Sequence, residues 1–227
     1  PFEIAETEVR GEMIKAYALA PPSLREIWLS SMQFADRDYL VYQDERWTYA
    51  EAHRDVAAIA CWLRANGVEP GDRVAISMRN YPEWLLSYWA CVSQGIAVVG
   101  MNAWWIGAEM KYGLQDSGPK VLICDQERLA RFNEVKDAFP TLTVVGVRLP
   151  EAVENVIPFS ELTKSGGEMP QVEVNPDDDA CIFYTSGTTG LPKGAQLTHR
   201  GCVNNIMNLA FSGTVFSTAT AIHNNVA

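Results

Sequence analysis

The stretch "RVAISMRNYPEWLLSYWACVSQGIAVVG", residues 73–100, contains two apolar runs separated by a segment with helix signals. The first run, Arg73–Met78, has the length and composition of a strand. The second run, Ile96–Gly100, is short and continuously apolar, as in strands that are buried on both faces. Pro82 is suited to the first turn of a helix between them, and Gly95 is suited to its end. A strand, a helix and a strand in this order predict two parallel strands joined by a crossover helix.

The residues before this unit predict a hairpin followed by an amphipathic helix. Tyr39–Tyr49 alternates around a polar Asp-Glu-Arg turn, which is typical of a β-hairpin. Thr48, followed three residues later by Glu51, forms a capping-box signature, and Asn66-Gly67 is suited to the end of the helix. The apolar residues of this helix recur at i, i+3, i+4 and i+7, which places on one face Val56, Ile59, Ala60 and Leu63.

The same alternation continues after the opening stretch. We predict a helix over Gly107–Ser117, a strand over Lys120–Asp125, a helix over about Gln126–Phe139 and a strand over Leu142–Val147. Strands and helices that alternate with short turns indicate an α/β fold, in which helices cover a largely parallel, layered sheet. Residues 1–150 are therefore interpreted as an N-terminal α/β subdomain.

The pattern weakens after this subdomain. Residues 151–176 contain scattered proline, glycine and acidic residues, so we interpret them as a surface connection, in which "FSEL" (159–162) could form one helical turn. A second unit, residues 177–227, begins with Asp177–Asp179. Three adjacent acidic residues before a strand cannot converge on one ion, so a solvated turn is favoured over a metal site.

The charge of the chain argues against a nucleic-acid partner. The 227 residues include 18 Lys and Arg against 28 Asp and Glu, and the net charge is −10. Residues 180–227 contain no acidic residue and carry only Lys193 and Arg200, so their charge is +2 and the rest of the chain carries −12. This acid-free segment contains the most unusual motif of the sequence.

Cysteine usage and hydropathy indicate a cytoplasmic protein without a transmembrane segment. None of the five cysteines forms a C-x-x-C pair, so neither a zinc site nor a redox motif is indicated. The first twelve residues are acidic and resemble no signal peptide. Residues 84–108 are uncharged and long enough to span a bilayer, but polar residues and glycines interrupt them, which favours a buried helix and strand. Four cysteines lie in apolar runs and are interpreted as reduced core thiols: Cys61, Cys91, Cys124 and Cys181.

The unusual motif is "TSGTTGLPKG", Thr185–Gly194. Ala180–Thr185 before it and Gly194–His199 after it are predicted to be strands. Small residues allow the backbone to approach a ligand closely. The motif also offers hydroxyls, backbone N–H donors and one cation, and it contains no acidic residue. This combination suits a polyphosphate. The candidate phosphate-binding residues are Thr185, Ser186, Gly187, Thr188, Thr189, Gly190 and Lys193.

This loop differs from a Walker A loop. In Walker A, the lysine and the following hydroxyl lead into a helix. Here Lys193 lies between Pro192 and Gly194, and the residues that follow favour a strand. Because proline has no N–H and a fixed φ, a helix N-terminus at Lys193 is disfavoured. We therefore expect phosphates to be held by a loop between two strands.

The segment "YTSGTTGLPKGAQLTHR", Tyr184–Arg200, resembles the phosphate-binding signature of the AMP-forming adenylating enzymes. That superfamily includes acyl-CoA synthetases, adenylation domains of peptide synthetases and luciferases. Two upstream segments, Trp47–Trp84 and Glu109–Asp125, resemble the N-terminal part of the same family. The resemblance extends over about Val41–Gly201, and the loop is its most specific part.

This resemblance implies an ATP-dependent acid–thiol ligase. A carboxylic acid, fatty or of another organic class, would attack the α-phosphate of Mg-ATP, and the acyl group would pass from the acyl-adenylate to coenzyme A. Carried onto this sequence, Thr185 to Gly190 would hold the β- and γ-phosphates, and Lys193 would neutralise the departing pyrophosphate. Thr185 is also the candidate neighbour of Mg²⁺. ATP, Mg²⁺ and coenzyme A are the expected cofactors and co-substrates, and a homodimer is a possible assembly.

The sequence departs from the family in two respects. Many relatives carry a Leu-Asn-Pro-like turn where this chain has "MNAWW" (Met101–Trp105), whose aromatic pair is interpreted as packing. Members are also more than twice as long, so we expect an N-terminal fragment that is inactive alone.

A helix over His199–Ala210 is expected, with capping or surface roles for His199 and Arg200. Two alternatives stay open: an adenylation domain of a peptide synthetase, and a non-catalytic nucleotide-binding, pyrophosphate-binding or dimerisation module.

Overall fold

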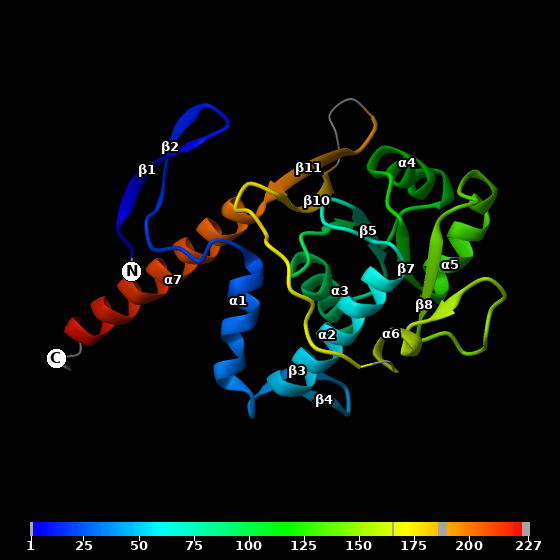
Figure 1. Cartoon of the computed structure of the whole chain (residues 1–227), viewed down its shortest axis with the longest axis horizontal. Coiled ribbons are helices and arrows are strands. Elements are labelled where there is room, and N and C mark those ends of the chain that lie inside the picture. The colour runs from blue at the N-terminus through cyan, green and yellow to red at the C-terminus, as the bar shows by residue number, and fades with distance from the viewer. Residues whose placement is uncertain (1, 165, 186–189, 224–227) are drawn as a thin grey trace.

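The computed structural model describes the backbone of residues 2–164, 166–185 and 190–223, with side chains up to Ser217. Seven strands form one sheet in the order β11-β10-β6-β5-β7-β8-β9 (Figure 1). All neighbours in it are parallel except β10 and β11, which confirms the largely parallel α/β sheet. The strands are β5 (Arg73–Ser77), β6 (Ala97–Gly100), β7 (Val121–Asp125), β8 (Thr143–Val147), β9 (Ile157–Pro158), β10 (Asp179–Thr185) and β11 (Lys193–Thr198).

Helices cover both faces of this sheet. On one face lie α1 (Leu24–Ser30), α2 (Tyr49–Ala65) and α3 (Pro82–Val92), and on the other lie α4 (Gly107–Ser117) and α5 (Gln126–Asn133). Side chains alternate along each strand, so β5 sends Val74 and Ile76 into the first layer and Ala75 into the second. A strand with helices on both sides must be apolar at every position, which explains the continuous apolar runs of the sequence.

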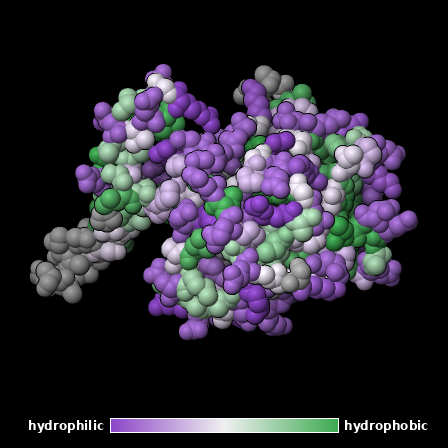
Figure 2. Space-filling view, in the orientation of Figure 1, coloured by the Kyte–Doolittle hydropathy of each residue, from purple (hydrophilic) through white to green (hydrophobic). Residues whose placement is uncertain are grey.

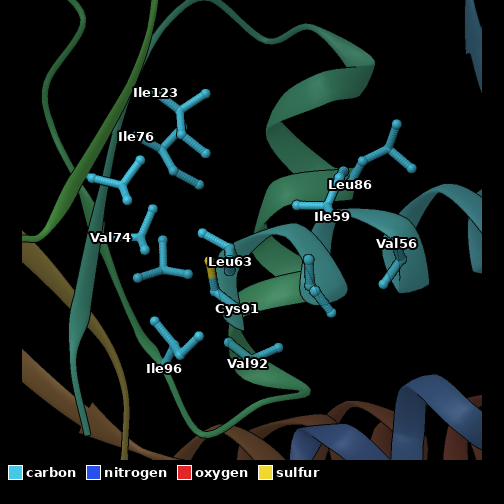
Figure 3. Packing of buried hydrophobic residues seen from close by; sticks show 14 of the residues in the cluster. Val56, Ile59, Leu63, Val74, Ile76, Leu86, Cys91, Val92, Ile96 and Ile123 are labelled. Atoms are coloured by element: carbon cyan, nitrogen blue, oxygen red, sulfur yellow. The ribbon is translucent and has the colours of Figure 1, made fainter. Parts of the chain in front are cut away.

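The first layer has its centre where α2 and α3 meet β5 (Figure 3). The predicted capping box at the start of α2 is present: the Glu51 backbone N–H donates to Thr48 Oγ1, and the Thr48 N–H donates to Glu51 Oε2 at 2.8 Å. The predicted apolar face of α2 is fully buried, with no solvent-accessible area on Val56, Ile59, Ala60 and Leu63. This confirms the amphipathic helix.

The strands of the expected second unit extend the sheet of the first. β10 lies beside β6, where Phe183 pairs with Gly100 in parallel register. A Cβ atom on Gly100 would lie 2.5 Å from the Phe183 ring, so this close pairing requires glycine in β6. The unit boundaries at residues 150 and 176 stay a prediction.

Replacing Gly100 with alanine is expected to lower the free energy of unfolding by about 1–3 kcal/mol, because the Phe183 ring must move. Urea denaturation would measure the loss. Gly201→Ala is the control, since its new Cβ would meet only Thr198 Oγ1 at an ordinary 3.5 Å. Equal stability of the two variants would contradict the required close pairing.

The segment expected as a surface connection also contributes to the fold. β9 forms the far edge of the sheet, and α6 (Ser160–Lys164) contains the turn expected at "FSEL". Leu162 of α6 is fully buried against the first helix layer. The connection therefore packs against the sheet and α2 along part of its length.

Buried charge joins α5 to the end of β7. The side chains of Arg128 and Asp125 are 1% and 6% exposed, and Arg128 Nη1 lies 3.1 Å from Asp125 Oδ2. The other carboxylate oxygen of Asp125 accepts the Arg128 backbone N–H and so caps α5. Arg128 Nε also donates to the carbonyl of Ala103 at 2.8 Å. This cluster ties α5 to the loop that follows β6.

An N-terminal hairpin that the sequence analysis did not predict packs beside the last helix (Figure 1). Its strands are β1 (Ile4–Val9) and β2 (Glu12–Tyr17), and the helix is α7 (His199–His223). The Tyr17 hydroxyl donates to Asn208 Oδ1 at 2.7 Å. Arg10 and Gly11 both have positive φ, as in tight hairpin turns. The hairpin predicted over Tyr39–Tyr49 is also present, as β3 (Asp38–Tyr42) and β4 (Glu45–Thr48).

Large apolar side chains lie exposed along α7, including Leu209 at 67% (Figure 2). Most of the remaining visible surface is hydrophilic. Within the described residues, no helix has the length and hydrophobicity required to cross a membrane. The uncharged run 84–108 instead forms α3, β6 and the start of α4, as predicted.

Candidate phosphate-binding site

The base of the predicted phosphate loop is formed by two paired residues. Thr185 ends β10, Lys193 begins β11, and the two are partners in the antiparallel ladder. The Thr185 hydroxyl lies 3.4 Å from the Lys193 carbonyl oxygen, and both residues are exposed. Lys193 therefore leads into a strand, which confirms the strand–loop–strand arrangement and its difference from Walker A. Ser186, Gly187, Thr188 and Thr189 lie outside the described residues.

Two glycines at the end of the loop occupy positions where a larger residue is disfavoured. Gly190 has a φ of +93°, a conformation that side chains rarely allow. A Cβ on Gly194 would lie 2.9 Å from Ile182 Cγ2 on the opposite strand. The small residues of the motif are thus required for conformation at one position and for packing at the other.

A cavity of about 370 Å³ lies beside the loop base. It is located at the carboxyl ends of the parallel strands β6 and β10, which is where ligands bind in open α/β sheets. The exposed ring of Trp104 (74%) forms part of its wall. Its lining residues are Asn102, Trp104, Trp105, Glu109, Tyr184, Thr185, Gly190 and Pro192.

Tyr184 is fixed in this wall by contacts that sequence reasoning missed. Its hydroxyl donates to Asp116 Oδ2 at 2.6 Å, and Trp105 meets its ring edge-to-face with centroids 5.2 Å apart. Burial raises the pKa of Tyr184, and the hydrogen bond to Asp116 raises it further. The predicted packing role holds for Trp105, which is 6% exposed. No sequence pattern joined Asp116 to Tyr184, because 68 residues separate them.

The described part of the site has one cation that is not neutralised. Lys193 forms no ion pair with any described carboxylate. Glu109 lines the cavity, but its carboxylate accepts the Ile106 backbone N–H at 3.0 Å and caps α4. The exposed hydroxyl of Thr185 and the ammonium of Lys193 thus form a polar, cationic edge that suits an anionic ligand. The binding roles of both residues stay a prediction.

Comparison with known proteins identifies the family. The profile of the family described as "AMP-binding enzyme" matches residues 28–225. The chain belongs to this family. The match includes β10, β11 and the whole predicted phosphate loop, so the resemblance inferred from the loop sequence is confirmed.

Relatives of this AMP-binding chain include CoA ligases. Feruloyl-CoA synthase from Amycolatopsis sp is 38% identical over 162 residues, which are 71% of this chain and 30% of the relative. 4-Coumarate–CoA ligase 2 from Nicotiana tabacum is 30% identical over 177 residues, 77% of this chain and 32% of that enzyme. The chain thus spans about 30% of the length of these relatives.

Solved structures agree with the sequence comparison. The crystal structure of the anthranilate CoA ligase AuaEII in complex with anthranoyl-AMP superposes with a TM-score of 0.73 at 25% identity. The matched region covers 80% of this chain and 35% of that one. The AMP-binding chain therefore has the fold of the N-terminal part of adenylating enzymes.

The two residues after β11 have structural contacts at the strand end opposite the loop. His199 Nδ1 accepts the Leu24 backbone N–H at 3.2 Å, at the start of α1. Arg200 forms two hydrogen bonds to the Asp177 carboxylate, at 2.7 and 2.9 Å. The nearby Asp178 accepts the Asn175 backbone N–H. These contacts fit the expected capping and turn roles, and the described residues contain no cluster of His, Cys, Asp or Glu that could hold a metal.

Acidification should destabilise this AMP-binding chain through His199. Burial lowers the pKa of His199 from 6.5 to about 4. The unfolded state therefore binds the extra proton between these pH values, so the free energy of unfolding falls as pH drops from about 7 to 4. We expect His199→Asn to reduce this pH-dependent loss by on the order of 2 kcal/mol. Urea titrations across this pH range would test it, and identical slopes would contradict it.

Proposed function

We propose that this chain is the N-terminal part of an ATP-dependent acid–CoA ligase, which activates a carboxylic acid as acyl-AMP and transfers the acyl group to coenzyme A. The observation that carries this proposal is the pairing of Thr185 with Lys193 at the base of a strand–loop–strand motif. The names of the relatives, feruloyl-CoA synthase and 4-coumarate–CoA ligase, support the reaction class.

The chemistry of the loop base suits this reaction. A carboxylate is a poor electrophile, and its attack on ATP brings two anions together while charge builds on the leaving pyrophosphate. Lys193, which is exposed and has no ion-pair partner among the described residues, would neutralise that charge. Thr185 to Gly190 would supply hydroxyl and backbone N–H donors to the β- and γ-phosphates.

The described donors also fit a magnesium ion carried by the nucleotide. Mg²⁺ prefers oxygen ligands and is usually held by few protein groups together with phosphates and water. The exposed Thr185 hydroxyl is the candidate protein oxygen at the loop base. When bound, the ion would shield the negative charge of the phosphates.

The activity is proposed for the intact protein rather than for these 227 residues. Since the chain spans about 30% of its relatives' length, we propose that it does not form acyl-adenylate alone. The acid is proposed to be organic. The sequence left open a fatty acid or an acid of another organic class, and the relatives' names, feruloyl-CoA synthase and 4-coumarate–CoA ligase, favour aromatic acids.

The test is carboxylate-dependent ATP–pyrophosphate exchange by the intact protein, with ferulate, 4-coumarate and palmitate as acids. Exchange with at least one acid, followed by CoA-dependent release of AMP, is the expected result. ATP binding without exchange for any carboxylic acid would overturn the ligase proposal. Exchange by residues 1–227 alone would overturn the proposed inactivity of this part.

A further inference from the structure

Two cysteines that are 21 positions apart in the sequence meet where β10 packs against the start of α7. Cys181 lies in β10 and is 1% exposed, and Cys202 lies in the first turns of α7 and is half-buried. Their Sγ atoms are 3.9 Å apart. All five cysteines of the chain are free thiols, and this is the one close sulfur–sulfur contact among the described residues.

The two thiols can be reached from a cavity. Both residues line an apolar cavity of about 540 Å³ between α3, β10 and α7. Tyr88, Phe183 and Leu197 form other parts of its wall. A small, uncharged oxidant such as hydrogen peroxide fits this space.

The environment distinguishes the two sulfurs. The hydrogen bond with Cys181 lowers the pKa of Cys202, whereas the same contact and burial raise the pKa of Cys181. Cys202 also lies near the N-terminus of a 25-residue helix, whose dipole favours negative charge. Cys202 is therefore the better nucleophile, and Cys181 is the neutral thiol beside it.

We propose that Cys181 and Cys202 form a peroxide-sensitive dithiol, which closes reversibly into a disulfide between β10 and α7. The Cys202 thiolate attacks one oxygen of hydrogen peroxide, the O–O bond breaks, and the products are Cys202 sulfenic acid and, after proton uptake, water. The Cys181 sulfur then attacks the sulfenic sulfur, an S–S bond forms, and the hydroxyl leaves as water with the Cys181 proton. Two thiols are oxidised, and one peroxide is reduced to two waters.

The movement required is small. A disulfide has an S–S length of about 2.05 Å, so the sulfurs must approach by about 1.9 Å. The closed bond would join the first turns of α7 to β10, four residues before Thr185. The dithiol would thus respond to oxidation at the strand that leads into the phosphate loop, whatever reaction that loop serves.

To test this, the intact reduced protein is treated with equimolar hydrogen peroxide, and the oxidation state and linkage of its cysteines are determined by mass spectrometry. We expect a peptide pair linked through Cys181 and Cys202, a mass loss of about 2 Da from two hydrogens, and full reversal by dithiothreitol. Cys181→Ser should instead accumulate a sulfenic acid on Cys202 that dimedone traps. Cys202→Ser should abolish both products.

Cys61→Ser is the matched control, because Cys61 is also a half-buried free thiol but donates to the Glu168 carbonyl and has no sulfur partner among the described residues. This variant should form the disulfide at the wild-type rate. Circular dichroism of each variant before oxidation verifies its fold. Oxidation of Cys61 in the wild-type protein, with Cys181 and Cys202 both still reduced, would overturn the proposal. Formation of the linked pair in folded Cys61→Ser would support it.

Discussion

Replacing Lys193 with methionine is expected to reduce carboxylate-dependent ATP–pyrophosphate exchange by the intact protein by about 10²–10³-fold. The reason is the position of this cation at the loop base, where it faces solvent and has no carboxylate partner among the described residues. Its full charge is therefore free to stabilise the negative charge that develops on pyrophosphate. Most of the effect should lie in kcat, because that charge is greatest in the transition state.

Two variants separate the charge of Lys193 from a general effect of substitution. Lys193→Arg keeps the charge but changes its geometry, so it should retain more exchange activity than Lys193→Met. Lys15→Met removes an exposed lysine from β2 and should leave activity unchanged. The unfolding midpoint should be the same in Lys193→Met, Lys193→Arg and Lys15→Met, since the Lys193 and Lys15 side chains are both exposed. Wild-type exchange by a folded Lys193→Met protein would contradict the proposed role.

Replacing Arg128 with alanine is expected to lower the free energy of unfolding by about 3–5 kcal/mol. Arg128 is almost fully buried against Asp125, and its removal leaves that carboxylate buried without its cation. The Ala103 carbonyl also loses one of its two hydrogen-bond donors and keeps the other, Arg131 Nη1. The carboxylate retains the backbone N–H groups of Arg79 and Arg128, which moderates the loss. Urea denaturation at neutral pH would measure it.

Arg64→Ala is the matched control for this prediction. Arg64 Nη2 lies 3.8 Å from Glu69 Oε2, with the two side chains 34% and 58% exposed. An exposed pair of this kind contributes at most about 1 kcal/mol, because water and salt screen it. Similar losses in Arg64→Ala and Arg128→Ala would show that burial of the Arg128 pair has no special effect on stability.

Local signals predicted the elements of the sheet well. The helix over Gly107–Ser117 has the predicted bounds, and the capping box of α2 is present. The helix predicted over Gln126–Phe139 ends earlier, at Asn133, and a separate 3₁₀ turn follows at Lys136–Ala138. Asparagine has low helix propensity, so this position was a weak point of the predicted helix.

The N-terminal hairpin was missed, although its turn signal is present. β1 alternates between exposed and half-buried residues, whereas the first four residues of β2 are all exposed; the turn between them lies at Arg10-Gly11, where both residues have positive φ. Its strands carry many charged residues and their apolar residues do not alternate, so no strand periodicity marked them. Its position depends on α7, since Tyr17 binds Asn208 at a separation of 191 residues.

The sequence by itself determined the alternation of strands and helices and the type of loop at Thr185–Gly194, because both depend on short-range periodicity and on the properties of Gly, Pro and Lys. Only the tertiary structure decided which distant residues meet. It places β10 beside β6, Tyr184 on Asp116, and Cys181 next to Cys202. Such contacts depend on strand order and helix packing, and no C-x-x-C spacing or other local pattern encodes them.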